Sequence, residues 1–215
     1  MDKRPLAQKM GNGNYGRVIR QGRSKAGIKY KEYCYWSNMY TRCNNSKYSD
    51  LFPTYKDVTI SKYFSDYNNF VDWCRSKKEF FYDNFVLDKD IVKPNNKMYH
   101  EDYCNFVPKE VNGFFVLHNN KRQKSLPLGV SWCESEGKYK TYCSQLNGKN
   151  KTLGRFNNEV DAGISYINFK NSMAGLLLDK WRNVLSEEVI FSLENYDVRN
   201  YVQEDACNHF LYLEK

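Results

Sequence analysis

The segment 138–145 carries an alternation of residue types that could bind a polyanion. In a β-strand, side chains point alternately to opposite faces, so Lys138, Lys140, Tyr142 and Ser144 would share one face. Ammonium and hydroxyl groups in such a row can reach phosphates and base edges when a sheet enters a major groove. An ordinary solvated face is the other interpretation, and the alternation by itself leaves both open.

A second group with possible chemistry is the carboxylate pair Asp88 and Asp90, separated by Lys89. Two close carboxylates can bind Mg²⁺, which prefers oxygen ligands. They can equally accept backbone N–H groups and shape a turn. The pair therefore predicts either a metal site or a structured loop.

Other patterns argue against further site classes. The seven cysteines contain no C-x-x-C pair, so neither a zinc knuckle nor a disulfide framework is indicated, and buried thiols in a reducing cytoplasm fit best. Gly11-x-Gly13-x-x-Gly16 has no apolar strand before it and no amphipathic helix directly after it, which argues against a nucleotide-binding loop. Residues 1–23 are polar and basic and no apolar run reaches 18 residues, so we expect neither a signal peptide nor a membrane helix.

Charge is distributed unevenly along the chain. The net charge is +8 with a pI of about 9.0, but residues 118–155 alone carry +6 whereas residues 156–215 carry −5. A short basic middle followed by an acidic end favours a nucleic acid over a membrane surface as the polyanionic partner.

The elements that would position these residues follow from periodicity and turn residues. Upstream of a polar linker at 118–125 we expect helices at 31–43 and 63–75, strands at 58–60 and 85–87, loops at 44–53 and 88–96, and a strand or helix end at 111–117. Downstream we expect strands at 129–133, 138–145 and 151–156 joined by Gly-containing turns, a helix starting at Asn158, and one or two further helices over 174–196.

The downstream pattern resembles a known family. Gly129-Val130, Gly137-Lys138-Tyr139, Gly148-Lys149, Leu153-Gly154-x-Phe156, Ala162 and Tyr166 occur in the order and spacing of the Apetala-type (ethylene-response-factor) DNA-binding domain. The resemblance implies a three-stranded sheet in the major groove with a helix behind it. It makes Trp132, Lys138, Lys140, Tyr142 and Arg155 candidate DNA contacts. Nearby cations extend the expected interface: Lys149 and Lys151 beside the hairpin, and Lys121, Arg122 and Lys124 in the linker.

Residues 30–112 resemble HNH-type homing endonucleases of phages, which often carry an Apetala-like module. The resemblance is carried by Trp36-x-x-Met39-x-x-Arg42-Cys43, Tyr67-x-x-Phe70-x-x-Trp73, Leu87-Asp88-Lys89-Asp90-Ile91 and Tyr99-x-x-x-x-Cys104-x-Phe106-Val107-Pro108, followed by Asn112. An HNH site uses a His as general base and an Asp with a later His or Asn to bind one divalent metal.

The resemblance implies metal binding by Asp88 and Asn112, with Asp90 as a possible further ligand. Lys89 stands where the base His is expected and Tyr103 where a middle Asn is expected; His100 is the alternative base. Lysine is cationic near neutral pH and would repel Mg²⁺. Mg²⁺ is thus the expected cofactor if the nuclease is active, and otherwise none is expected.

The sequence as a whole predicts an α+β protein. We expect a flexible basic arm (1–25), a degenerate HNH-like ββα-metal domain (26–117), a linker (118–125), an Apetala-like module (126–172) and a helical extension (173–215). The expected function is double-stranded DNA binding by a phage-encoded protein in the cytoplasm of an infected bacterium, with nuclease activity lost or weakened. Two alternatives stay open: an active Mg²⁺-dependent endonuclease, and a phage accessory protein that inhibits a host defence or transcription protein through the acidic C-terminal helices.

Overall fold

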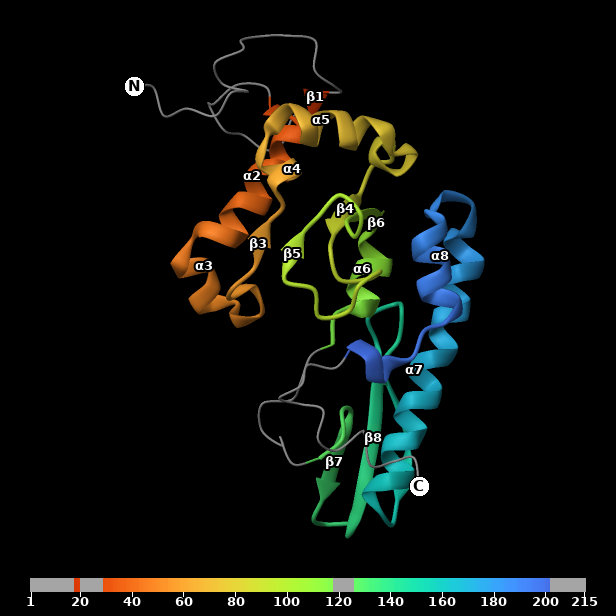
Figure 1. Cartoon of the computed structure of the whole chain (residues 1–215). Helices are drawn as coiled ribbons and strands as arrows, with labels where there is room; N and C mark the ends of the chain where they lie inside the picture. The colour runs from red at the N-terminus through yellow and green to blue at the C-terminus, as the bar shows by residue number, and fades with distance from the viewer. Residues whose placement is uncertain (1–17, 20–28, 118–125, 202–215) are drawn as a thin grey trace. The chain divides into compact units, whose positions relative to one another are not determined.

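A computed structural model describes residues 18–19, 29–117 and 126–201 (Figure 1). They divide into two compact units with the boundary between Phe106 and Val107. The expected boundary was the linker at 118–125, which lies outside the described residues, as do most of the predicted arm and the Gly11–Gly16 motif. The division comes earlier because Phe114 and Phe115 pack their rings against Tyr196 of unit 2.

Unit 1 consists of short strands and helices. Its elements are β1 (Val18–Ile19), β2 (Lys29–Tyr30), α2 (Lys31–Asn44), α3 (Ser46–Leu51), η1 (Pro53–Tyr55), β3 (Thr59–Ile60), α4 (Lys62–Ser65), α5 (Tyr67–Ser76), η2 (Lys78–Phe81), β4 (Phe85–Asp88), β5 (Met98–Tyr99) and β6 (Asn105–Pro108), the strand in which the unit ends. β1 pairs with β2, β3 with β5 and β4 with β6.

An aromatic core holds unit 1 together. It is a connected group of five buried aromatic side chains: Phe64, Phe70, Trp73, Phe80 and Phe106. Phe64 contacts Phe70 and Trp73, and Phe106 contacts Trp73 and Phe80. Burying side chains of this size contributes most of the stabilisation available to a small unit. The helix predicted from residue 31 occurs as α2 and ends at Asn44, as expected. The strand predicted at 85–87 occurs as β4, which ends one residue later.

Two polar side chains change the expected elements of unit 1. Residues 44–53 were expected to form a loop, but Asn45 accepts the backbone N–H of Tyr48 and starts α3. The helix expected at 63–75 is broken at Asp66, whose carboxylate accepts the N–H groups of Asn68 and Asn69 and starts α5. Both are N-caps, which compete with a continuous helix by satisfying the free N–H groups of a new first turn.

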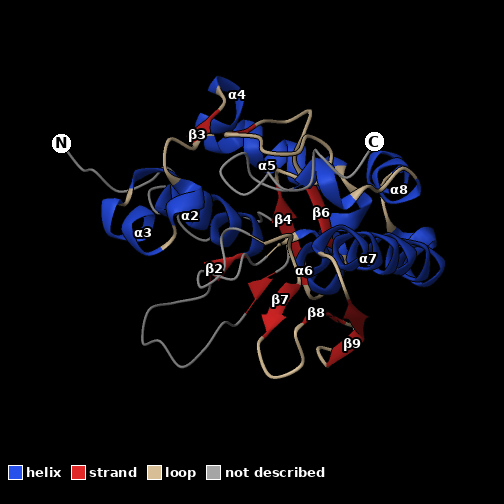
Figure 2. Ribbon diagram, turned by 90° about the horizontal axis from the view of Figure 1, so that it is seen from below, coloured by secondary structure: helices blue, strands red, loops and turns tan. Residues whose placement is uncertain are grey.

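Unit 2 begins in β6 and is built on one sheet. Its elements are α6 (Lys109–Phe115), β7 (Val130–Cys133), β8 (Lys138–Ser144), β9 (Asn150–Phe156), α7 (Glu159–Trp181), η3 (Arg182–Val184), α8 (Glu187–Glu194) and η4 (Val198–Tyr201). The sheet is antiparallel with the order β7-β8-β9, as the turn residues predict (Figure 2). Asn158 caps α7 by accepting the N–H of Asp161 at 2.8 Å.

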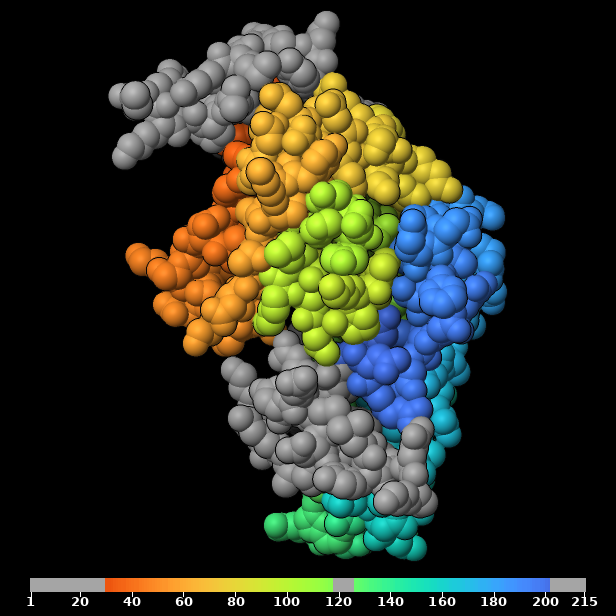
Figure 3. Space-filling model, in the orientation of Figure 1, coloured from red at the N-terminus to blue at the C-terminus, as the bar shows by residue number. Residues whose placement is uncertain are grey.

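α7 packs on one face of this sheet and runs on to contact α8. The second half of α7 and α8 form one continuous surface (Figure 3). The expected division at residue 172 therefore falls inside a single 23-residue helix. Leu177, Leu185, Val189 and Leu193 are buried where α7 and α8 meet.

The described chain is thus a mixed helix-and-strand protein with a three-stranded antiparallel sheet, as the α+β prediction required. Among its described helices, none has the length and apolar character needed to cross a bilayer.

Candidate nucleic-acid interface and the Asp88 loop

The face of the sheet turned away from α7 carries the predicted basic row. Cross-strand pairing places Ser131 beside Lys140 and Lys140 beside Arg155. Lys138 lies two residues before Lys140 on the same face, and Tyr142 lies two residues after it, opposite Thr152. Lys138 and Arg155 are exposed, whereas Lys140 and Tyr142 are half-buried. We call the surface formed by Lys138, Lys140, Tyr142 and Arg155 the open face.

The opposite face of β8 fixes this orientation. Thr141 and Cys143 are buried towards α7, and Thr141 Oγ1 donates a hydrogen bond to the carbonyl of Ala162 at 3.1 Å. A one-residue slip of β8 would bury lysines and expose these two side chains. The register irregularity opposite Thr141 and Tyr142 leaves Leu153 as the extra residue of β9, so the alternation of β8 is preserved.

Two predicted DNA contacts lie on the face towards α7. Trp132 pairs with Tyr139, and their ring centroids are 4.8 Å apart in an edge-to-face arrangement. Lys151 pairs with Cys143, and its Nζ lies 4.8 Å from the ring centroid of Phe169 on α7. The register therefore separates Trp132 and Lys151 from the open face, although Trp132 remains 41% exposed.

The other predicted contacts are placed as follows. Lys149 is exposed in the turn between β8 and β9. Arg155 forms an ion pair with Glu136, an acidic residue of the β7–β8 turn that the sequence reasoning had left out. Lys121, Arg122 and Lys124 lie outside the described residues.

In unit 1, Asp88 ends β4 and organises the loop that follows. Its Oδ1 accepts the backbone N–H groups of Asp90 and Ile91, each at 2.8 Å. Burial raises the pKa of Asp88 to about 6, and the neighbouring Asp90 adds to this rise, while the two backbone hydrogen bonds oppose it. The carboxylate acts here as the acceptor of a turn.

Lys89 supplies a buried cation to the same loop. It is 6% exposed, and its Nζ donates to Asp90 Oδ1 at 2.5 Å and to the carbonyl of Asn96 at 2.6 Å. Burial raises the pKa of Asp90, and the adjacent Lys89 works against this rise. Asn96 closes the loop by donating to the carbonyls of Lys89 and Met98 and accepting the N–H of Met98.

Of the remaining residues of the predicted nuclease site, His100 and Tyr103 contact each other, with ring centroids 5.1 Å apart. His100 Nδ1 lies 3.6 Å from carboxylate oxygens of Glu101 and Asp102 and accepts the Asp102 N–H, and no hydrogen bond or ion pair joins it to Asp88 within the described chain. Tyr103 stacks under Lys93, whose Nζ is 4.3 Å from the ring centroid. Asn112 is half-buried in α6 of unit 2, and its placement against Asp88 is not determined.

Chemically, the Asp88 loop pairs carboxylate oxygens with donors of its own, whereas the open face carries cations and the half-buried Tyr142 on the side of the sheet away from α7. In the described residues, no group of three or more His, Cys, Asp or Glu side chains is arranged to hold a metal ion. Lys89 and Asn96 satisfy the polar groups of the loop where the sequence pattern suggested metal chemistry. Comparison of the chain with protein-family models, with curated proteins and with solved structures finds no match.

Proposed function

We propose that the protein binds double-stranded DNA through the open face of the unit 2 sheet. The observation that carries the proposal is the placement of three cations, Lys138, Lys140 and Arg155, on one face of a sheet whose other face is packed on a helix. α7 supports one face of the sheet, and no described helix covers the face with the three cations, which suits insertion into a groove.

The spacing suits a phosphate backbone. Residues two apart on a strand are separated by about 7 Å, and directly paired residues by about 5 Å. Lys138 and Lys140 therefore provide two charges along the strand, and Arg155 provides a third across it. Phosphate contacts of this kind supply affinity, whereas base-edge contacts by Lys140 or Tyr142 would supply sequence preference.

We infer that unit 1 is an HNH-derived scaffold in which nuclease activity is lost or weakened. The support is the position of Asp88 at the end of β4, a strand that pairs with β6, and the ion pair between Lys89 and Asp90. A protonated ammonium cannot take a proton from water, and it competes with a divalent cation for the Asp90 carboxylate. Given the resemblance to phage homing endonucleases, we propose that the protein is encoded by a phage and acts in the cytoplasm of the host.

One observation favours a protein partner as a second candidate. Leu176 on α7 and Phe191 on α8 are 60% and 66% exposed, and α8 begins with Glu187 and Glu188. An acidic surface with exposed apolar side chains would be rejected by DNA but could contact a host protein.

Binding and cleavage can be tested on one DNA preparation with and without Mg²⁺ or Mn²⁺. The variant Lys138→Glu/Lys140→Glu is compared with Lys56→Glu/Lys62→Glu, which makes the same charge change at exposed lysines of unit 1. We expect the first to weaken duplex binding at least about tenfold, since each charge contact contributes about 1 kcal/mol or more, and the second to change it little.

We expect no nicking of supercoiled plasmid with either metal. Equal loss of binding in both double variants would show that only net charge matters and would remove the open face from the proposal. Nicking that requires Asp88 would instead establish the active endonuclease, and absence of duplex binding would leave the protein-partner function.

A further inference from the structure

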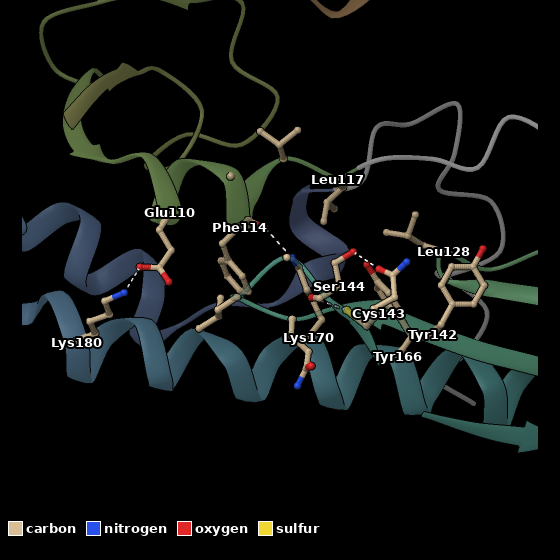
Figure 4. A pocket seen from close by; sticks show the side chains of 17 residues that line it. Glu110, Phe114, Leu117, Leu128, Tyr142, Cys143, Ser144, Tyr166, Lys170 and Lys180 are labelled. Atoms are coloured by element: carbon tan, nitrogen blue, oxygen red, sulfur yellow. Dashed lines mark hydrogen bonds and ion pairs between the residues drawn. The ribbon is translucent and has the colours of Figure 1, made fainter. Parts of the chain in front are cut away.

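Unit 2 contains a cavity that shares one residue, Tyr142, with the open face. Its volume is about 740 Å³, and its lining comes from α6, the segment before β7, the end of β8 with its following turn, and α7 (Figure 4). Phe114, Leu117, Leu128 and Leu146 form apolar walls. A cavity of this volume, with apolar walls and a few polar and charged groups, is in the size range of small-molecule sites in proteins.

The cavity holds a buried cation without a carboxylate partner. Lys170 is 7% exposed, its Nζ donates to the carbonyl of Phe114 at 2.7 Å, and it lies 4.0 Å from the centroid of the Phe114 ring. Among the described residues it forms no ion pair. Burial lowers the pKa of Lys170 to about 8, so the side chain is still mainly protonated at pH 7.

The other charged groups of the lining are already matched. Glu110 and Lys180 lie at one end of the cavity (Figure 4), with Lys180 Nζ 2.5 Å from Glu110 Oε2. Trp181 Nε1 donates to the same oxygen. Cys143 and Tyr166 also line the cavity, and burial raises the pKa of each, so both are neutral near pH 7. Keeping a buried charge uncompensated is costly, which makes the Lys170 site one that an anion would stabilise.

We propose that this cavity binds a small organic carboxylate, with the carboxylate against Lys170 and an apolar body against Phe114, Leu117 and Leu128. A single ammonium matches a single negative charge. The described lining has no arginine, and its second lysine is paired with Glu110, so a dianionic phosphate would lack partners. Of the residues that define the open face, the cavity lining contains only Tyr142, and neither the evidence for the carboxylate site nor its readout involves DNA.

Octanoate and its neutral analogue octanamide are the probes, titrated into the full-length protein by calorimetry. They differ at the head group and share the apolar chain. We expect saturable binding of octanoate at one site and binding of octanamide weaker by on the order of tenfold to a hundredfold, the range of a charge-assisted hydrogen bond. Lys170→Met should abolish this preference, because it keeps most of the side-chain stem and removes the charge.

Lys109→Met is the control, since it removes an exposed lysine of the same unit that does not line the cavity. It should leave the preference for octanoate intact. A second measurement uses the wild-type protein with ¹³C-methylated lysines and follows the pKa of Lys170 by NMR. Bound octanoate should raise this pKa. Equal binding of octanoate and octanamide, or an equal effect of the two lysine variants, would overturn the proposal.

Discussion

Asp88 shows how a carboxylate in a metal-like sequence pattern can serve a loop. Its Oδ1 is used by two backbone N–H groups, a role for which a neutral amide oxygen would suffice. The negative charge itself is disfavoured, because burial and Asp90 raise the pKa to about 6. A substitution that keeps the acceptor oxygen of Asp88 and removes its negative charge can therefore test the two properties separately.

We expect Asp88→Asn to stabilise the protein in a pH-dependent way. Between about pH 4 and pH 6 the folded state binds this proton more strongly than the unfolded state, so the stability of the wild type falls as pH rises through 6. The variant should match the wild type at pH 4 and exceed its free energy of unfolding by about 1–3 kcal/mol at pH 8. Urea denaturation across this range measures the difference, and exposed Asp83→Asn should change stability by less than about 0.5 kcal/mol throughout. A variant less stable than wild type at pH 8 would mean that the folded loop needs the Asp88 charge.

Glu136 is the acidic residue closest to the proposed interface, since it pairs with Arg155. Glu136→Gln should free the guanidinium and remove a charge that repels phosphate. We expect duplex binding to tighten about twofold to fivefold, the equivalent of a solvent-exposed ion pair, as measured by fluorescence anisotropy. Glu134→Gln, an exposed change of the same charge in the same turn, is the control. Weaker binding in Glu136→Gln would indicate that the ion pair positions Arg155 for contact.

At the scale of elements, Gly129 fixes how β7 enters the sheet. Its φ is +75°, and a Cβ there would lie 2.2 Å from a ring carbon of Tyr166 and 2.8 Å from the carbonyl oxygen of Tyr142. The glycine is therefore required both by its backbone conformation and by the close approach of α7. Gly137, in the β7–β8 turn, has φ of +60° but open space around the position of a Cβ.

Substitution of these two glycines distinguishes the cost of backbone strain, present at both, from the cost of a steric clash, present only at Gly129. Gly137→Ala should cost about 1 kcal/mol in free energy of unfolding, the penalty of a left-handed alanine. Gly129→Ala should cost about 3 kcal/mol or more, because the Tyr166 ring must also move. Thermal or urea unfolding of both variants measures the difference. Equal costs would show that Tyr166 adjusts without loss and that the approach of α7 to β7 is loose.

The sheet was the most predictable element. Period-two alternation and Gly turns define β7, β8 and β9 locally, and the Asn158 cap marks the start of α7. The break at Asp66 and the start of α3 at Asn45 were missed because a capping side chain inside a helical pattern competes with a helix that could run through it. The faces of Trp132 and Lys151 depend on cross-strand register, which residue spacing within one strand does not define.

For the candidate nucleic-acid interface, the sequence predicted the cations of the open face but not the side chains that pair with them. Lys138 and Lys140 follow from alternation, whereas the Arg155–Glu136 ion pair requires the fold of two turns. The burial of Lys170 also escaped prediction, because a lysine on an amphipathic helix is usually solvated and the contact with Phe114 comes from a segment 56 residues earlier. Asn96 carried a weak signal, its position at the end of the loop after Asp88.

At the scale of the whole molecule, the basic region is followed by an acidic one. Residues 118–155 carry +6 and residues 156–215 carry −5, so a polyanion is attracted by one region and repelled by the other. If the net charge of +8 governed association, lysines in either unit would contribute alike. If the open face governs association, only the cations of that face would displace counterions from the DNA.

The salt dependence of duplex binding separates these two cases. Four cations on or beside the open face, Lys138, Lys140, Lys149 and Arg155, give an expected slope of log K against log salt of about −3.6, and linker contacts would make it steeper. Lys138→Glu/Lys140→Glu should flatten the slope by about 1.8, because two phosphate contacts are lost. Lys56→Glu/Lys62→Glu should leave the slope unchanged, since those lysines belong to unit 1 and make no contact in the proposed complex. Titrations at several salt concentrations measure both slopes. A similar flattening in the two variants would mean that association follows net charge, and the open face would then have no special role.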